Sequence, residues 1–157
     1  MGRAFVREGE TEEPLAERPV STHPNFVTPR GLAQIELRLR QLERERSQAR
    51  ARGERQRLAE VERDLRYYSA RRGNAQLVVT PINLPGKTAQ LRFGALARVR
   101  MPDGRERTFR VVGEDEAEPG AGLVSHASPL ARALLGRAVG ETVAFGAGEL
   151  ELLAIEA

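Results

Sequence analysis

The strongest constraint on this fold is a pair of heptad patterns within residues 31–73. In each arm, apolar residues recur at 3-4-3 spacing, which is the spacing of a and d positions in a coiled coil. The seam positions are Leu32, Ile35, Leu39 and Leu42 in the first arm, and Leu58, Val61, Leu65 and Tyr68 in the second. The pattern therefore predicts two helices that pack against each other through these side chains.

The two seams mirror each other about Arg50. Paired antiparallel, they match Leu42 with Leu58, Leu39 with Val61, Ile35 with Leu65 and Leu32 with Tyr68. Such a register needs a turn near Arg50, and Gly53 lies where a helix can end in a left-handed residue. We therefore expect a tight antiparallel hairpin, shaped like a finger.

The boundaries of this hairpin follow from local signals. Thr28 suits the N-cap and Pro29 the first helical position, while Gly73-Asn74 closes the second helix. The preceding residues 1–26 are polar and acidic, contain three prolines and show no periodicity. We expect residues 1–26 to form an extended or disordered leader and residues 27–74 to form the coiled-coil hairpin.

From residue 75 the pattern changes to short apolar runs separated by turn residues. Strands are predicted at residues 77–82, 91–93, 97–101, 108–112, 123–125, 141–145 and 149–155. Pro102-Asp103-Gly104 is a strong hairpin signal, and Ser128-Pro129 starts a short helix that Gly136 stops. We expect an α+β chain in which residues 75–157 form a five- or six-stranded antiparallel sheet with one short helix.

Charge is unevenly distributed along the chain. The net charge is +3, and residues 31–73 alone hold 12 Arg against 7 acidic residues. A basic rod can bind nucleic acid or an acidic protein channel, although the flanks of any coiled coil are rich in charge. Cysteine is absent, which excludes disulfides and thiolate zinc sites.

The chain has no apolar run near the ~18 residues of a membrane span and no signal-peptide pattern. The acids in residues 114–118 do not match a calcium-loop pattern, and we interpret them as a solvated loop. We therefore expect a cytoplasmic monomer without membrane contact, metal or cofactor.

Two long strings resemble a known family. Residues 113–117 read Gly-Glu-Asp-Glu-Ala, and residues 128–136 read Ser-Pro-Leu-Ala-Arg-Ala-Leu-Leu-Gly. With the hairpin before them, opened by Val27-Thr28-Pro29-Arg30-Gly31-Leu32 and followed by Asn74-Ala75-Gln76, they are similar to the bacterial Gre transcript-cleavage and elongation factors. The resemblance covers residues 27–157 and leaves out the leader.

The resemblance implies an FKBP-like C-terminal domain that docks on bacterial RNA polymerase. In the family, the coiled coil enters the secondary channel, where a pair of tip carboxylates helps to hold a second magnesium ion for cleavage of backtracked RNA. On this basis the polymerase-binding residues are expected to be Asp115, Glu116, Ser128, Pro129 and Leu130.

The tip of this hairpin departs from the family pattern. Its charged residues are Arg46, Arg50, Arg52, Glu54, Arg55 and Arg57, so one carboxylate stands among five arginines. The arms are also several turns shorter, with about 27 Å of helix from Leu32 to Arg50. We expect weak or no stimulation of cleavage, with the arginines contacting the channel, nascent RNA or nucleotide phosphate.

Two alternatives stay open. The chain could be an active cleavage factor that uses Glu54, its weak catalytic candidate, beside carboxylates of the polymerase. It could instead be a coiled-coil interaction module for another partner, as in the nucleoside diphosphate kinase regulators. In the leading interpretation the protein regulates RNA polymerase and is not an enzyme by itself.

Overall fold

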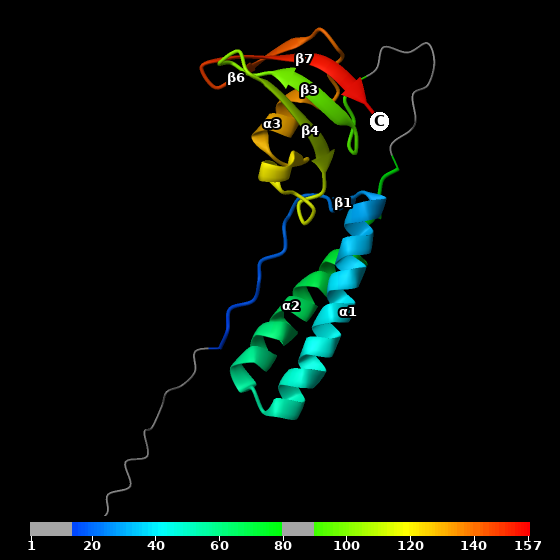
Figure 1. Ribbon diagram of the computed structural model, residues 1–157, viewed down its shortest axis with the longest axis vertical. Helices are drawn as coiled ribbons and strands as arrows, with labels where there is room; N and C mark the ends of the chain where they lie inside the picture. The colour runs from blue at the N-terminus through cyan, green and yellow to red at the C-terminus, as the bar shows by residue number, and fades with distance from the viewer. Residues whose placement is uncertain (1–13, 80–89) are drawn as a thin grey trace, which may run out of the picture.

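Figure 1 shows the computed structural model, which describes residues 14–79 and 90–157. A pair of long helices extends away from a curled sheet, so the chain is α+β as expected. The predicted strand residue Ile82 lies outside the described residues. Within the described ranges, no helix is long and apolar enough to cross a membrane.

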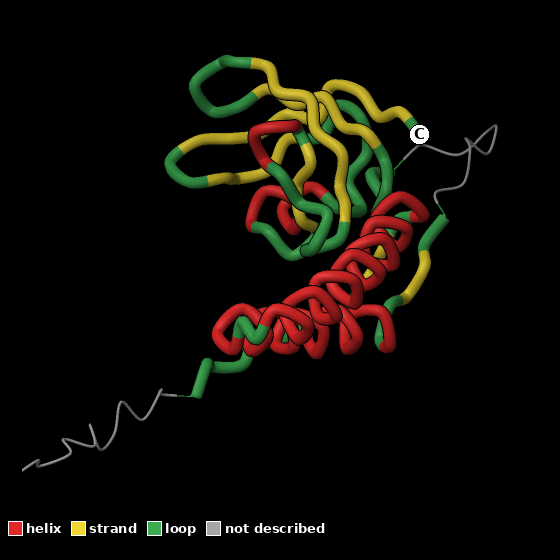
Figure 2. The backbone as a smooth tube through the Cα atoms, turned by 60° about the horizontal axis from the view of Figure 1, so that its bottom comes forward, coloured by secondary structure: helices red, strands yellow, loops and turns green. Residues whose placement is uncertain are grey.

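The hairpin consists of α1 (Pro29–Arg52) and α2 (Arg55–Gly73), which lie side by side along their length (Figure 2). Thr28 is the N-cap of α1, because its hydroxyl accepts a hydrogen bond from the Gly31 N–H at 2.9 Å. Both helix starts and ends therefore fall close to the predicted positions. With 24 residues, α1 is about 36 Å long.

The turn lies at Gly53 and Glu54, which confirms the predicted helix end at Gly53 and places the centre of the turn three to four residues after Arg50. The helix α1 continues through Arg52 because Gly53, with φ of 68°, is the residue that can adopt the left-handed conformation ending it. The seam extends accordingly to Ala49, which is 2% exposed. Leu58 is half-buried and lies outside the buried cluster of the hairpin.

The other predicted seam positions do pack together. The buried cluster of the hairpin contains Ile35, Leu39, Leu42, Val61 and Leu65, with Leu32 and Tyr68 packed at its edge. Val27 closes the same cluster at the base of the finger. The heptad pattern thus identified the face through which the two helices associate.

The sheet of the C-terminal part has the strand order β5-β4-β3-β7-β6. Its strands are β3 (Leu96–Arg100), β4 (Glu106–Val112), β5 (Leu123–Ser125), β6 (Thr142–Phe145) and β7 (Gly148–Glu156). The short helix α3 (Pro129–Leu134) packs on it and buries Leu130, Ala131 and Leu134 in the core around Phe109.

Three sheet predictions need correction. The sheet is mixed, because the loop after β4 and the 3-10 helix η1 (Pro119–Ala121) carry the chain back so that β5 runs parallel to β4. Residues 91–93 form no strand; Leu91 is buried and its N–H bonds the Arg137 carbonyl at 2.7 Å. The predicted strand at 77–82 is reduced, in its described part, to β2 (Gln76–Leu77), which pairs in parallel with β1 (Phe26–Val27).

Candidate functional site

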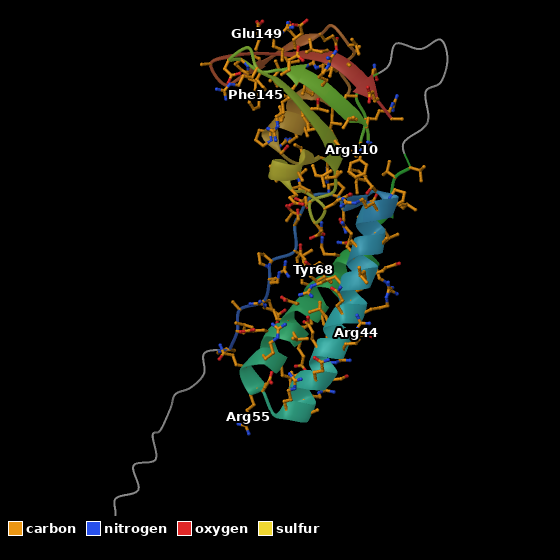
Figure 3. The ribbon with its side chains drawn as sticks, in the orientation of Figure 1. Arg44, Arg55, Tyr68, Arg110, Phe145 and Glu149 are labelled. Carbon is orange, nitrogen blue, oxygen red and sulfur yellow. The ribbon has the colours of Figure 1, made fainter. Side chains whose placement is uncertain are left out.

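The hairpin tip is dominated by exposed arginines that are partly neutralised by glutamates. Arg57 pairs with Glu45 on α1 at 3.0 Å, and Arg50 pairs with Glu62 on α2 at 3.3 Å. Arg55 projects from the start of α2 at the far end of the finger (Figure 3). Among the described residues, Arg46 and Arg55 make no ion pair within 4.0 Å.

The donor set at the tip does not fit a magnesium ion. Glu54 is the carboxylate at the turn, and its side chain is 46% exposed and lies 3.9 Å from Arg52. Magnesium needs several hard oxygen ligands, and nearby guanidinium groups repel a divalent cation. The described residues contain no group of three or more potential ligand side chains that could hold a metal.

The acidic loop, residues 113–118, is the second charged region, and it contacts the base of the hairpin. Asp115 accepts a hydrogen bond from Arg71 Nε at 2.5 Å and another from the Tyr67 hydroxyl at 2.5 Å. Arg71 has no exposed surface and also lies 3.4 Å from Glu114. A buried guanidinium on α2 therefore ties the helix to the sheet domain.

Glu116 makes a matching contact with the start of α1. Its carboxylate accepts from the Thr28 hydroxyl and from Arg30 at 3.0 Å, and its side chain is 3% exposed. The interpretation of this loop as solvated is therefore wrong for Asp115 and Glu116. The reason is tertiary: the loop lies against the base of the hairpin, where the helix cap and Arg71 supply partners.

Burial shifts the pKa of two groups at this junction. Desolvation, together with the hydrogen bond to Asp115, raises the pKa of Tyr67 to about 12. Desolvation lowers the pKa of His126, whose ring lies 5.2 Å from Phe26 and 5.7 Å from Phe93, centroid to centroid. Burial therefore favours the uncharged form of each ring.

The predicted polymerase-binding residues divide into two groups. Ser128 caps α3 by accepting from the Ala131 N–H at 3.2 Å, Pro129 is exposed, and Leu130 is 7% exposed within the core. Asp115 and Glu116 instead bind the hairpin. Pro129 is the one of these five residues classed as exposed.

Comparison with known proteins finds similarity to one family. A family model described as "Transcription elongation factor, GreA/GreB, C-term" matches residues 87–156. A transcription elongation factor GreB of Neisseria meningitidis serogroup B is 36% identical over 106 residues. These matches identify residues 87–156 as a GreA/GreB C-terminal domain. The alignment with this GreB covers 65% of this chain and 64% of the GreB, so the chain spans just under two thirds of that relative.

Other relatives extend the coverage at lower identity. A transcription elongation factor GreA of Agrobacterium fabrum is 29% identical over 160 residues, covering 90% of this chain and 99% of that protein. Among solved structures, GreA factor homolog 1 of Thermus thermophilus is 18% identical. It covers 86% of this chain and 100% of its own, with a TM-score of 0.39.

The sequence prediction missed the junction residues Tyr67 and Arg71. They are four positions apart on α2 and so share one helix face. Neither residue belongs to the predicted apolar seam, and polar residues outside a seam are normally assigned to solvent. The cluster of acids at residues 114–116 was the signal that could have identified a partner for Arg71.

Proposed function

We propose that this protein is a Gre-type regulator of transcription elongation that binds bacterial RNA polymerase. The observation that carries the proposal is the match of residues 87–156 to the GreA/GreB C-terminal domain, preceded by a helical hairpin that extends away from the sheet. In this proposal the C-terminal domain docks at the secondary channel and the hairpin enters it.

The docking face centres on the start of α3. Pro129 is exposed and fixed in direction by the Ser128 cap and by Leu130, which anchors the helix in the core. Asp115 and Glu116 support the docking from behind, because they hold the hairpin against the same domain.

The arginine tip acts by binding anionic groups. Arg46 and Arg55 are free of ion pairs within the described residues, and Arg50 and Arg52 pair only at solvent-exposed sites. Exposed ion pairs are weak, so these guanidinium groups remain available to carboxylates of the channel or to phosphates of RNA or nucleotide. Cleavage stimulation is weak or absent in this proposal, because the tip lacks a second carboxylate.

Retention of purified RNA polymerase on the immobilised protein tests the docking. Pro129→Ala should weaken binding by about 1–3 kcal/mol, as expected for an interface anchor. The matched control is Pro102→Ala in the β3–β4 turn, which should bind like the original protein. Failure to retain polymerase at low salt would contradict the proposal and favour an interaction module for another partner.

A further inference from the structure

The segment before the hairpin, residues 14–27, is in contact with both halves of the molecule. Figure 1 shows it running along α2 and then passing beneath the sheet domain to the start of α1. We call this segment the strap. It lies outside residues 87–156, the matched family domain, so that match does not explain its contacts.

Along α2, the strap covers the tyrosine that faces the acidic loop. The guanidinium of Arg18 lies 3.9 Å from the centre of the Tyr67 ring and 3.3 Å from the Asp64 carboxylate. Glu17 pairs with Arg66 at 2.6 Å, but both side chains are more than half exposed, so this pair contributes little. The stacked Arg18 is therefore the main attachment at this end.

At the junction, the strap binds the elements that join the hairpin to the sheet. Ser21 donates a hydrogen bond to Glu114 at 3.0 Å. Asn25 is 3% exposed and donates to the Arg71 carbonyl at 2.7 Å, at the end of α2. The strap thus touches the same arginine whose side chain carries the ion pair to Asp115.

The last strap residues pack on the sheet domain itself. The ring of Phe26 lies 5.9 Å from that of Phe93, centroid to centroid, and also contacts His126. Its carbonyl oxygen would lie 2.3 Å from a Cβ at position 113, so Gly113 is required for this close approach. The main chain of the strap therefore lies directly on the first residue of the acidic loop.

From these contacts we propose that residues 14–27 form a built-in strap that fastens the helical hairpin to the sheet domain. It works by covering the buried contact of Tyr67 and Arg71 with Asp115, since exclusion of water strengthens a charged contact. Pro14, Pro19 and Pro24 restrict the strap and reduce the entropy lost when it docks. The strap itself does not depend on the proposed function. Only the further idea that the strap sets the direction of the hairpin within a polymerase rests on the proposed function.

The test measures how much the hairpin moves relative to the sheet domain. Spin labels on Gln48→Cys at the far end of α1 and on Ala147→Cys in the β6–β7 turn report the distance distribution between them. The chain has no cysteine of its own, and both positions are exposed. The full chain should give one narrow distribution, and removal of residues 1–24 should broaden it by a factor of about two or more.

A milder variant keeps the proposal testable even if the truncated protein does not fold. Arg18→Ala with Ser21→Ala removes two strap contacts and should broaden the distribution to a lesser degree, with the helical circular dichroism signal retained. The matched control Thr22→Ala lies in the strap, is exposed and should change nothing. If the truncated protein loses helical circular dichroism signal, the width of the distance distribution in the double variant tests the proposal instead.

An unchanged width after removal of the strap contacts would overturn the proposal, as would an equal broadening by Thr22→Ala. Polymerase binding, measured in parallel, separates this inference from the proposed function. Broadening in a protein that never binds polymerase would support the strap and contradict the polymerase proposal alone.

Discussion

Arg71 is the residue on which the connection between the two parts depends. A buried guanidinium is costly unless charged and hydrogen-bonding partners surround it. Here Asp115 and Glu114 supply the opposite charge, while Nη1 has no hydrogen-bond partner among the described residues. The arrangement is therefore sensitive to the loss of either side, because the remaining charge would be buried and unpaired.

Replacing Arg71 should destabilise the protein strongly. Arg71→Ala leaves Asp115 without its main partner, and breaking a buried ion pair costs about 3–5 kcal/mol. The matched control is Arg72→Ala, the exposed neighbour, which should change the stability by less than about 0.5 kcal/mol. Urea unfolding of both variants measures the difference, and equal stability of the two would contradict this view of Arg71.

Tyr67 should titrate at unusually high pH. The folded pKa of about 12 lies above the ordinary value of 10.0, so folding favours the protonated phenol. The resulting stabilisation is complete below pH 10.0 and is lost as the pH rises through about 12. Tyr68→Phe leaves Tyr67 as the single tyrosine, whose ionisation is followed by ultraviolet absorbance.

Adding Asp115→Asn to the Tyr68→Phe protein should lower the pKa of Tyr67. The substitution removes a carboxylate whose negative charge disfavours ionisation of the Tyr67 hydroxyl. Circular dichroism on the same samples verifies that the fold persists. A midpoint near 10.0 in the folded Tyr68→Phe protein would show that Tyr67 does not contact Asp115.

At the scale of elements, the hairpin and the sheet are stabilised by separate cores. The hairpin cluster and the sheet cluster share no buried residue. Each fully buried Leu or Val of the hairpin seam contributes roughly 1.5–3 kcal/mol. Because this cluster is small, one charged residue within it should unfold the finger while leaving the sheet intact.

Leu39→Asp should melt the finger. Leu39 is 8% exposed, and a buried unpaired carboxylate costs several kcal/mol. The control is Leu37→Asp on the same helix, where the side chain is 45% exposed and a charge meets water. Circular dichroism should show helix loss only for Leu39→Asp. The amide NMR signals of the sheet residues should persist in that variant. Full helicity in that variant would show that the seam is assigned incorrectly.

Local signals explain which elements the sequence predicted. The heptads, the Thr28 cap and the Pro102-Asp103-Gly104 turn act over a few residues, and each lies at or next to its predicted place. The parallel β5, the docked leader and the partners of Arg71 depend on segments that meet only in the folded chain. No periodicity carries that information. The polymerase-binding residues and the role of the tip stay predictions.

At the scale of the whole molecule, the acidic loop lies at the base of the hairpin and the arginine tip lies at its far end. Carboxylates of the acidic loop pair with Arg71 and Arg30 at the junction, whereas five arginines lie near the far end of the finger, at positions 46, 50, 52, 55 and 57. The protein therefore presents a cationic tip on a rod about 36 Å long. We infer that this tip acts through charge and not through a bound metal.

Transcript cleavage in backtracked RNA polymerase complexes tests this claim most directly. The RNA should shorten little from its 3′ end when the protein is added with magnesium. Any effect on elongation should survive Glu54→Ala and should decrease in Arg50→Ala with Arg52→Ala, more strongly at low salt, where exposed charges are least screened. Strong cleavage that disappears in Glu54→Ala would contradict the account.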